Sequence, residues 1–324
     1  MKRPWLASFT PLYAAGLALR SLRLGAGWEP VRRLRFPVVS IGNLSTGGAG
    51  KTPLAIALAR ALTQRGLFAD VLSRGYGRMS WQPALVDPNG TAEEFGDEPL
   101  LIARTTGVPV YVARQRYQAG LLAESAMSDR VKSAIHLLDD GFQHRQLHRD
   151  VDILLLSRQD WHDSLLPAGN LREALRAAHR ADVITIPTDD PAFETELRAW
   201  GWQGPIWRLS RKMAIPAVDG PVLAFCGIAR PEQFFAGLEA AGLHIAARIA
   251  FPDHHRCTTP GLDRLKTAAH ESAAVALITT EKDRIRLGEL TSAFPESPPL
   301  LTAKLRVEIE DESAAIDWLV DRAT

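Results

Sequence analysis

The chain has 324 residues, 46% of them hydrophobic and 23% charged, which is typical of a globular protein with a full core. Its 38 basic and 37 acidic residues give a formal net charge of +1, so no overall positive field points to nucleic acid, and we expect no nucleic-acid partner. The two cysteines, Cys226 and Cys257, lie far apart without metal-ligand spacing, which favours reduced thiols in a cytosolic protein.

The N-terminal segment is apolar and almost free of acidic residues. Residues 4–19 carry no charge, arginines flank them, and Glu29 is the only acidic residue before Asp70. As a helix this run would reach about 24 Å at ~1.5 Å per residue, which is short of the roughly 30 Å of a hydrocarbon core. We therefore expect residues 1–30 to form an amphipathic helix that lies on an anionic membrane surface. A helix packed on the protein's own core is almost equally compatible with the pattern.

From residue 36 onward, short apolar runs alternate with helical patterns. The predicted strands lie at residues 36–41, 69–73, 108–112, 135–138, 151–156 and 182–186. The predicted helices between them lie at residues 52–64, 98–105 and 115–128. This alternation predicts an α/β fold with a mostly parallel sheet and helices on both faces.

A second, shorter series follows after the pattern weakens between Arg208 and Gly220. Its predicted strands lie at residues 222–226, 244–251 and 274–279, and its predicted helices at residues 231–241, 260–269 and 308–322. We therefore predict a larger domain at residues 31–210 and a smaller α/β domain at residues 211–324. A cleft between two such domains suits an enzyme that closes on two substrates.

A glycine-rich loop joins the first predicted strand to the first predicted helix. It reads Ser45-Thr46-Gly47-Gly48-Ala49-Gly50-Lys51-Thr52. A strand, such a loop and a helix form the context of a P-loop, in which backbone N–H groups and the helix dipole hold phosphate. Lys51 would reach the β- and γ-phosphates of a nucleotide, and the Thr52 hydroxyl would bind Mg²⁺.

The loop departs from the general P-loop motif at one position. Ser45 stands where the general motif has glycine, although Gly-Lys-Thr after an apolar strand disfavours a turn without a ligand. A GTPase should carry Asn-Lys-x-Asp, and the nearest match, residues 280–283, lacks the asparagine and the spacing. The sequence therefore favours ATP.

Two adjacent carboxylates, Asp139 and Asp140, follow the predicted strand at residues 135–138. A P-loop enzyme holds Mg²⁺ at a strand-end aspartate, and adjacent carboxylates repel each other unless a cation lies near. An Asp-Gly turn would explain one of these aspartates well and the second poorly. We expect one of the two to bind Mg²⁺, and the sequence does not decide which.

Two further segments combine acidic residues and histidine. Asp97 stands at a predicted helix start, where it could be a general base, but the sequence alone favours an N-cap. His254 follows a predicted strand beside another histidine and an aspartate, where it could bind metal or orient a base. On its own this segment is better interpreted as a polar loop.

Two basic segments each allow a functional and a purely structural interpretation. Arg172 and Glu173 could reach a phosphate and Mg²⁺, although a charge pair at a helix start is the commoner meaning. The loop that contains Arg74, Tyr76 and Arg78 is hinged by glycines and could clamp an anionic substrate. A solvated surface loop is an equally good interpretation.

In their order and spacing, these segments resemble the tetraacyldisaccharide 4'-kinase family, the lipid A 4'-kinases of Gram-negative bacteria. The resemblance covers nearly the whole chain and is carried by residues 42–53, 74–77, 96–99, 139–144, 166–173, 251–255 and 279–283. It implies a P-loop NTPase-like kinase that uses ATP and Mg²⁺ to phosphorylate the 4'-hydroxyl of a tetraacyldisaccharide 1-phosphate. This is a late step of lipid A biosynthesis, at the cytoplasmic face of the inner membrane, with no obligate protein partner.

The resemblance also implies roles for individual residues. Asp97 becomes the catalytic base with His254 as its support, and Lys51 acts on the phosphates. The implied Mg²⁺ contacts are Thr52, Asp139 or Asp140, Gln143 and Glu173. From the two basic segments described above, the expected substrate contacts are Arg74, Tyr76, Arg78 and Arg172. The sequence departs from the family pattern at Ala174 and at Arg256-Cys257, which puts local geometry in doubt.

Two other functions stay open at this point. A membrane-associated P-loop ATPase could drive a partner protein or metal delivery, with the histidine segment as a metal site. A nucleotide-sensing module is a more distant third. A cleaved signal peptide is disfavoured because an ATP-dependent enzyme would lose its nucleotide supply outside the cytoplasm.

Overall fold

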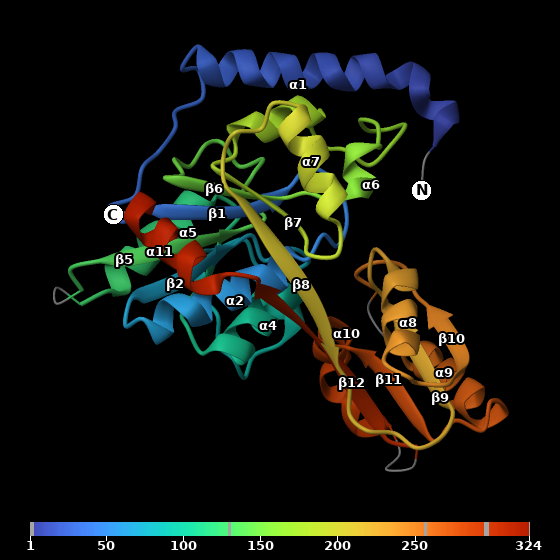
Figure 1. Cartoon of the computed structure of the whole chain (residues 1–324). Coiled ribbons are helices and arrows are strands. Elements are labelled where there is room, and N and C mark those ends of the chain that lie inside the picture. Colours follow the sequence, from blue (N-terminus) through green and yellow to red (C-terminus); the bar gives the residue numbers. More distant parts are fainter. Residues whose placement is uncertain (1–2, 129–130, 256–257, 295–297, 324) are drawn as a thin grey trace.

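The computed structural model describes residues 3–128, 131–255, 258–294 and 298–323. One sheet of twelve strands runs through two lobes, in the order β10-β9-β11-β12-β8-β7-β6-β1-β5-β2-β4-β3 (Figure 1). Neighbouring strands are parallel except at the pairs β12–β8 and β3–β4. The predicted mostly parallel α/β sheet is therefore confirmed.

The first lobe contains the P-loop and most of the sheet. Its strands are β1 (Val38–Asn43), β2 (Phe68–Ser73), β3 (Ala84–Leu85), β4 (Val110–Val112), β5 (Ala134–Asp139), β6 (Val151–Leu155) and β7 (Val183–Pro187). Its helices are α2 (Lys51–Gln64), α3 (Ala92–Phe95), α4 (Asp97–Thr106), α5 (Arg116–Ala126), α6 (Arg158–Trp161), the 3₁₀ helix η2 (Leu175–Arg180) and α7 (Pro191–Ala199).

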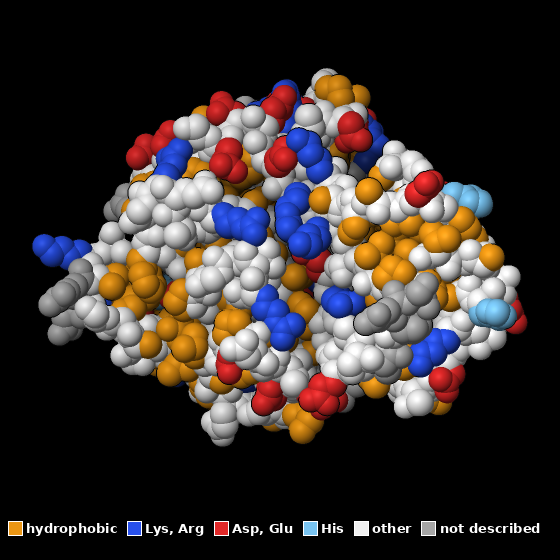
Figure 2. Space-filling view, turned by 90° about the horizontal axis from the view of Figure 1, so that it is seen from below, with side chains coloured by type: hydrophobic (Ala, Val, Ile, Leu, Met, Phe, Trp, Pro, Cys, Tyr) orange, Lys and Arg blue, Asp and Glu red, His pale blue; other side chains and the backbone are white. Residues whose placement is uncertain are grey.

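The second lobe is a smaller α/β unit. Its strands are β9 (Val222–Cys226), β10 (Ile245–Ala250) and β11 (Ala276–Thr280). Its helices are α8 (Pro231–Ala240), α9 (Thr259–Glu271), α10 (Glu281–Leu287) and the 3₁₀ helix η3 (Gly288–Ala293). Viewed from the side opposite α1, Lys and Arg side chains gather in the hollow between the lobes (Figure 2). Arg256 and Cys257 lie outside the described residues, and Cys226 is a buried free thiol.

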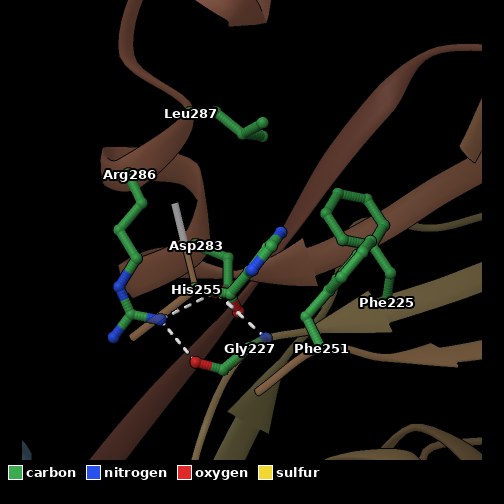
Figure 3. A pocket seen from close by; sticks show the side chains of 7 residues that line it. All are labelled: Phe225, Gly227, Phe251, His255, Asp283, Arg286 and Leu287. Atoms are coloured by element: carbon green, nitrogen blue, oxygen red, sulfur yellow. Dashed lines mark hydrogen bonds and ion pairs between the residues drawn. The ribbon is translucent and has the colours of Figure 1, made fainter. Parts of the chain in front are cut away.

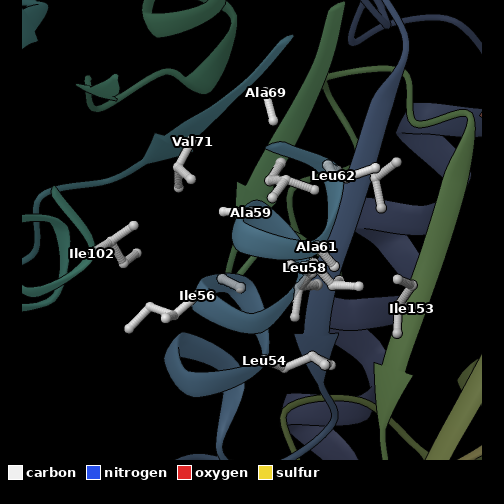
Figure 4. Close-up of a cluster of buried hydrophobic side chains, with 14 of the residues drawn as sticks. Leu54, Ile56, Leu58, Ala59, Ala61, Leu62, Ala69, Val71, Ile102 and Ile153 are labelled. Atoms are coloured by element: carbon white, nitrogen blue, oxygen red, sulfur yellow. The ribbon is translucent and has the colours of Figure 1, made fainter. Parts of the chain in front are cut away.

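Helix α2 anchors the largest core cluster. Leu54, Leu58 and Leu62 recur every four residues, the helical repeat that places them on one face, and all three are completely buried (Figure 4). Burying each leucine side chain contributes about 1.5–3 kcal/mol relative to leaving it exposed. This packing fixes α2 on the sheet, and with it the loop that precedes the helix.

Two long strands join the lobes, and neither was predicted. β8 (Ile206–Ala214) pairs with β7 in the first lobe, and its antiparallel partner β12 (Leu300–Ile309) pairs with β11 in the second. The segment interpreted as a weakening of the pattern is therefore a strand. Its side chains are only partly buried, so it lacks the continuous apolar run of the central strands.

The C-terminal helix packs on the first lobe, although the division predicted at residue 210 assigns it to the second domain. α11 (Glu312–Ala323) follows the predicted second domain in sequence, yet Ala315, Ile316 and Leu319 are buried in the same cluster as the core of α2. The chain reaches this place because β12 carries it back from the second lobe (Figure 1). The predicted helix at residues 308–322 is thus a real helix from Glu312, but it completes the first lobe.

The N-terminal segment forms the 3₁₀ helix η1 (Pro4–Phe9) and the helix α1 (Thr10–Gly25), which extends across the top of the first lobe (Figure 1). Leu24 is the one buried residue among the described residues 4–25. Trp5, Leu12 and Leu22 are 76%, 74% and 69% exposed. None of the helices in the described part of the chain combines the length and hydropathy needed to cross a membrane.

Candidate active site

The P-loop connects β1 to α2 as the sequence predicts. Gly47 and Gly50 have φ angles of 101° and 94°, in the left-handed region where glycine is favoured. Gly50 is the N-cap of α2, and no described side chain caps this helix. The first N–H groups of α2 and its dipole are therefore directed at the loop, which is the arrangement that binds phosphate.

Ser45 is part of the loop's support. It is 1% exposed, its hydroxyl accepts a hydrogen bond from Asn43 Nδ2 at 3.2 Å, and its backbone forms a bridge with Leu171. The next residue, Thr46, donates its N–H to the carbonyl of Asn170 at 2.8 Å. The residue that breaks the general motif thus fastens the loop to the segment at residues 170–172.

Lys51 lies against the end of β1. Its Nζ donates to Asn43 Oδ1 at 2.9 Å and lies 3.4 Å from Asp140 Oδ1. Asn43 Oδ1 also accepts from Arg172 Nη2 at 2.6 Å. The side chain of Asn43 therefore holds the cations Lys51 and Arg172 in place. Sequence reasoning missed this role because asparagine carries no charge.

The two adjacent aspartates have opposite environments. Asp140 has a φ of 52° and accepts two hydrogen bonds from Arg172, at 2.9 and 3.1 Å. Burial opposes its ionisation, but Lys51 and Arg172 hold the pKa of Asp140 well below its usual range. For Asp139, burial and the charges of Glu98 and Asp140 raise the pKa to about 7. Asp140 forms ion pairs with two cations of the protein, whereas no described residue forms one with Asp139.

The oxygens around Asp139 fit a magnesium ion. Asp139 Oδ1 and Gln143 Oε1 are buried and have no hydrogen-bond partner among the described residues. Gln143 donates its Nε2 to the carbonyl of Asn43 at 2.9 Å, which leaves its oxygen available. Thr52 is 2% exposed in the first turn of α2. Such hard oxygen donors suit Mg²⁺, and a cation would lower the raised pKa of Asp139.

Glu173, the remaining predicted Mg²⁺ contact, pairs with an arginine. Its two carboxylate oxygens accept hydrogen bonds from Arg180 at 2.6 and 3.1 Å. In the structure the charge of Glu173 is therefore already paired with that of Arg180. The described residues also hold no cluster of three His, Cys, Asp or Glu side chains that could bind a metal. Mg²⁺ sites of nucleotide enzymes commonly have few protein ligands, because phosphate and water complete them.

Asp97 is not the N-cap that the sequence alone favours. Gly96, with a φ of 91°, occupies the cap position, and Asp97 is the first residue of α4. Its Oδ1 accepts the N–H of Glu98 at 3.0 Å, while its Oδ2 faces the second lobe, 3.5 Å from His254 Nδ1. The N-cap interpretation is wrong because the glycine, with its positive φ, takes that place. The carboxylate is directed across the lobe interface instead.

Known relatives match most of this chain. Residues 2–324 match the family model described as LpxK, tetraacyldisaccharide-1-P 4'-kinase. The chain belongs to this family. Among the similar proteins, the tetraacyldisaccharide 4'-kinase of Koribacter versatilis is 41% identical over 95% of this chain and 96% of its own length. That of Geobacter metallireducens is 36% identical over 89% of each chain.

A solved relative has the same fold. The structure described as the "apo" form of LpxK from Aquifex aeolicus in complex with ATP matches with a TM-score of 0.75, 31% identity and 98% of each chain covered. Membership of the LpxK family confirms the predicted P-loop NTPase-like fold and the predicted activity, a lipid kinase of lipid A biosynthesis.

In this member of the LpxK family, the loop that contains Arg74, Tyr76 and Arg78 lies next to His254. The ring of Tyr76 is 58% exposed and lies 4.9 Å from the ring of His254. Arg74 is exposed, whereas Arg78 is 6% exposed and donates Nη2 to the carbonyl of Gln82 at 2.7 Å. Tyr76 and Arg74 are therefore accessible to a ligand, and Arg78 is folded into its own loop.

Sequence reasoning missed three arginines of the site. Arg116 is 7% exposed, lies near Asp140 and Arg74, and has its pKa lowered to about 10, chiefly by burial. Arg211, on β8, donates to the carbonyl of Ala49 in the P-loop. Arg286, on α10, pairs with Asp97. No motif marks the first two. Arg286 follows the segment at residues 279–283, for which the resemblance supplied no role.

Proposed function

We propose that this kinase transfers the γ-phosphoryl group of ATP, bound at the P-loop, to the 4'-hydroxyl of a tetraacyldisaccharide 1-phosphate, with Asp97 as the base. The observation that carries the proposal is the closeness of the two ends of the site. Glu98, next to Asp97, raises the pKa of Asp139. Lys282 interacts electrostatically with Asp97, Glu98 and Asp139. The base and the phosphate end therefore belong to one site.

At the phosphate end, the residues from Ser45 to Thr52 would hold the nucleotide. The backbone N–H groups and Lys51 would bind phosphate oxygens, which is how P-loop enzymes stabilise the charge of a transferring phosphoryl group. The ATP present in the Aquifex relative supports this choice of nucleotide. Thr52, Asp139 and Gln143 would hold Mg²⁺, which supplies charge neutralisation when it is bound.

At the acceptor end, Asp97 would accept the proton of the sugar hydroxyl. Burial opposes its ionisation, but the hydrogen bond with His254 and the charges of Arg286 and Lys282 hold the pKa of Asp97 well below its usual range. A carboxylate of such low basicity suits a loose phosphoryl transfer, where positioning matters more than early proton abstraction. Its first task is to orient the hydroxyl, and His254 supports it across the interface.

The cations beyond the P-loop fit an anionic acceptor. Burial together with Arg116, Arg149 and Arg20 lowers the pKa of His144 to about 3, which shows how densely positive charge gathers here. We propose that Arg116 and Arg74 contact the phosphate of the lipid, with Tyr76 beside them. Arg172 is already paired with Asp140, so its contribution to the acceptor is indirect.

The N-terminal helix would bring the kinase to its lipid. Tyr13 donates to the carbonyl of Arg172 at 2.9 Å and Arg20 to the carbonyl of Gln143 at 2.9 Å, so one side of α1 adjoins the site. Its exposed apolar side chains and flanking arginines suit a membrane surface with anionic head groups. We place the enzyme at the cytoplasmic face of the inner membrane, where ATP is available, without an obligate protein partner.

One assay separates the candidate functions. The protein is incubated with γ-labelled ATP, Mg²⁺ and tetraacyldisaccharide 1-phosphate, and the label is located by chromatography. Label on the lipid supports the proposal. Label released as inorganic phosphate without lipid product supports a P-loop ATPase that drives a partner, and label that remains on ATP supports a nucleotide sensor. Lys51→Met serves as the control that removes phosphate contacts and should abolish transfer.

We predict that the exposed apolar side chains of η1 and α1 contribute to membrane binding. In the variant Trp5→Ser/Leu12→Ser/Leu22→Ser, binding to vesicles that contain anionic lipid should fall at least tenfold. A tenfold loss corresponds to about 1.4 kcal/mol, and the burial of a single large apolar side chain contributes roughly 1.5–3 kcal/mol. Sedimentation measures the bound fraction. Deletion of residues 1–24 is the stronger variant, and Tyr13→Phe is the matched control that leaves the apolar face intact. Unchanged sedimentation of both altered chains would refute the membrane role.

A further inference from the structure

Arg286 links the two lobes at the proposed base. Its side chain on α10 is 7% exposed, and that of Asp97 on α4 is 5% exposed. Arg286 Nε donates to Asp97 Oδ2 at 2.6 Å, and Nη2 contacts the same oxygen. Nη1 donates to Asp283 Oδ1 at 3.0 Å and to the carbonyl of Gly227 (Figure 3). The guanidinium is therefore fixed on its own lobe while it holds a carboxylate of the other.

The same guanidinium also meets His254. Arg286 Nη2 lies 3.2 Å from His254 Nδ1, and Asp97 Oδ2 lies 3.5 Å from that nitrogen. An unprotonated Nδ1 can accept from Arg286, whereas a protonated Nδ1 can only donate, and Asp97 is the acceptor within reach. Arg286 and Asp97 thus compete for one atom of His254. The backbone N–H of His254 donates to the carbonyl of Gly227 at 3.2 Å, the group that Arg286 also holds.

We propose that Arg286 is a positioning residue of the kinase reaction, which holds the carboxylate of Asp97 and the loop of His254 in one arrangement across the lobe interface. This inference rests on the proposed role of Asp97 as the base. The cavity beside Arg286, lined by Phe225, Phe251 and Leu287 among others, has a volume of about 20 Å³. It has room for a water molecule and none for a sugar. Arg286 therefore acts through Asp97 and His254.

The charges around Asp97 determine what the loss of Arg286 would do. α10 contributes Arg286, Lys282 and Asp283, α4 contributes Glu98, and the neighbouring loops contribute His254, Asp253 and Tyr76. Among these, Arg286 lowers the pKa of Asp97 and also that of His254, whose pKa is raised above its usual value by Asp97. Removing this cation raises both pKa values, because a nearby positive charge favours the deprotonated form of each group.

The experiment compares Arg286→Gln with Arg286→Lys in the full-length kinase. In Arg286→Gln we expect kcat to fall about 10- to 100-fold, as for a misplaced catalytic group, while KM for ATP stays near that of the wild type. The pH profile of kcat/KM should move to higher pH. Arg286→Lys keeps the charge, so its profile should stay near the wild-type position even though its rate falls. Arg284→Gln is the matched control, because Arg284 lies on the same helix and donates to the carbonyl of Leu300 in its own lobe.

The outcomes distinguish a positioning role from a purely structural one. A lower rate in Arg286→Gln with an unmoved pH profile, or a profile that moves equally in Arg286→Lys, overturns the proposal. Thermal unfolding and ATP binding of each variant show whether the fold survives, and Arg286→Lys keeps the test open where Arg286→Gln does not fold. Asp97→Asn is measured in parallel. If Asp97→Asn retains near-normal turnover, the proposed function of Asp97 fails, whereas full loss there with normal Arg286→Gln kinetics rejects only the role of Arg286.

Discussion

The two ends of the site are built in different ways. At the phosphate end, Asp140 is held by Lys51 and Arg172, which belong to the same lobe. At the base end, Asp97 on the first lobe is held by Arg286 and His254 on the second. The ion pairs of Asp140 therefore lie within one lobe, whereas those of Asp97 cross between the lobes. On the proposed roles of these residues, we expect a nucleotide to bind to the first lobe alone and transfer to require both lobes.

This difference gives the largest predicted effect at Asp97. Asp97→Asn should lower kcat by about 10²- to 10⁴-fold, the usual contribution of a general base, and should leave the affinity for ATP near that of the wild type. Single-turnover transfer and equilibrium ATP binding measure the two properties. Asp87→Asn is the control, because Asp87 is an exposed aspartate of the same lobe that accepts the N–H of Asn89. Impaired ATP binding in Asp97→Asn would contradict the separation of the two ends.

At the phosphate end, the prediction concerns Mg²⁺. Asp139→Asn removes the buried carboxylate that has no cation partner, so we expect the Mg²⁺ concentration for half-maximal activity to rise about 10- to 100-fold, as is usual when the support of a bound ion is lost. Titration of activity against Mg²⁺ at saturating ATP measures this value. The same titration with Glu173→Gln decides whether that residue takes part, since Arg180 occupies it in the structure. A normal Mg²⁺ requirement in Asp139→Asn would reject the assigned site.

A smaller effect is expected from the second ion pair between the lobes, Lys282 with Glu98. Both side chains are about a quarter exposed, at 25% and 26%, and partly exposed pairs contribute only about 0.2–1 kcal/mol. Lys282→Met and Glu98→Gln should therefore each lower kcat a few-fold. A double-mutant cycle measures their coupling. The same cycle is measured for Arg286 and Asp97. Equal coupling energies would mean that the two ion pairs contribute equally to the contact between the lobes.

A buried pair within the first lobe sharpens the comparison. His136 Nδ1 lies 2.8 Å from Asp70 Oδ1, and both side chains are completely buried. Burial opposes the charged imidazole, but Asp70 and Glu124 raise the pKa of His136. Its stabilising contribution is thus complete below about pH 6.5 and is lost as the pH rises through the higher pKa of the folded state. Unfolding at pH 6 and pH 9 should show this fall in the wild type and not in His136→Gln.

For His136→Gln we expect about 1–3 kcal/mol of lost stability at pH 6, the cost of disturbing a buried polar pair, with kcat unchanged. Unlike Asp97 and His254, this pair lies within one lobe, and among the described residues its ion pairs join only Asp70, His136 and Glu124. A change in kcat that exceeds the effect of the lost stability would show that the two regions communicate.

The sequence predicts the parts of this molecule that follow from local patterns. The P-loop, the strand that ends at Asp139 and the helix of residues 51–64 are local features, and the structure has them within two residues of the predicted bounds. Asp97 was misjudged because its partners are nearly 160 and 190 residues away along the chain, at His254 and Arg286. Nothing in the local pattern at residue 97 distinguishes a cap from a carboxylate that faces another lobe.

The strands β8 and β12 were missed for a related reason. They cross between the lobes, so only part of each strand is buried and neither shows continuous apolar residues or strict alternation. The domain boundary predicted at residue 210 falls inside β8, and the return of the chain to the first lobe cannot be read from local periodicity. Arg211 escaped notice with its strand, although it reaches the P-loop.

The antiparallel ribbon of β8 and β12 gives the molecule a mechanical property. β8 has nine residues, and at about 3.3 Å per residue its length is about 30 Å. For a lever arm of that length, a bend of about 6° displaces the far end by about 3 Å, which is more than the tolerance of a hydrogen bond. If Asp97 is the base, a slight change in the curvature of two strands would therefore be enough to engage or release it. On the proposed roles of Asp97 and His254, we therefore expect transfer in this kinase to depend on the stiffness of the ribbon that joins the lobes.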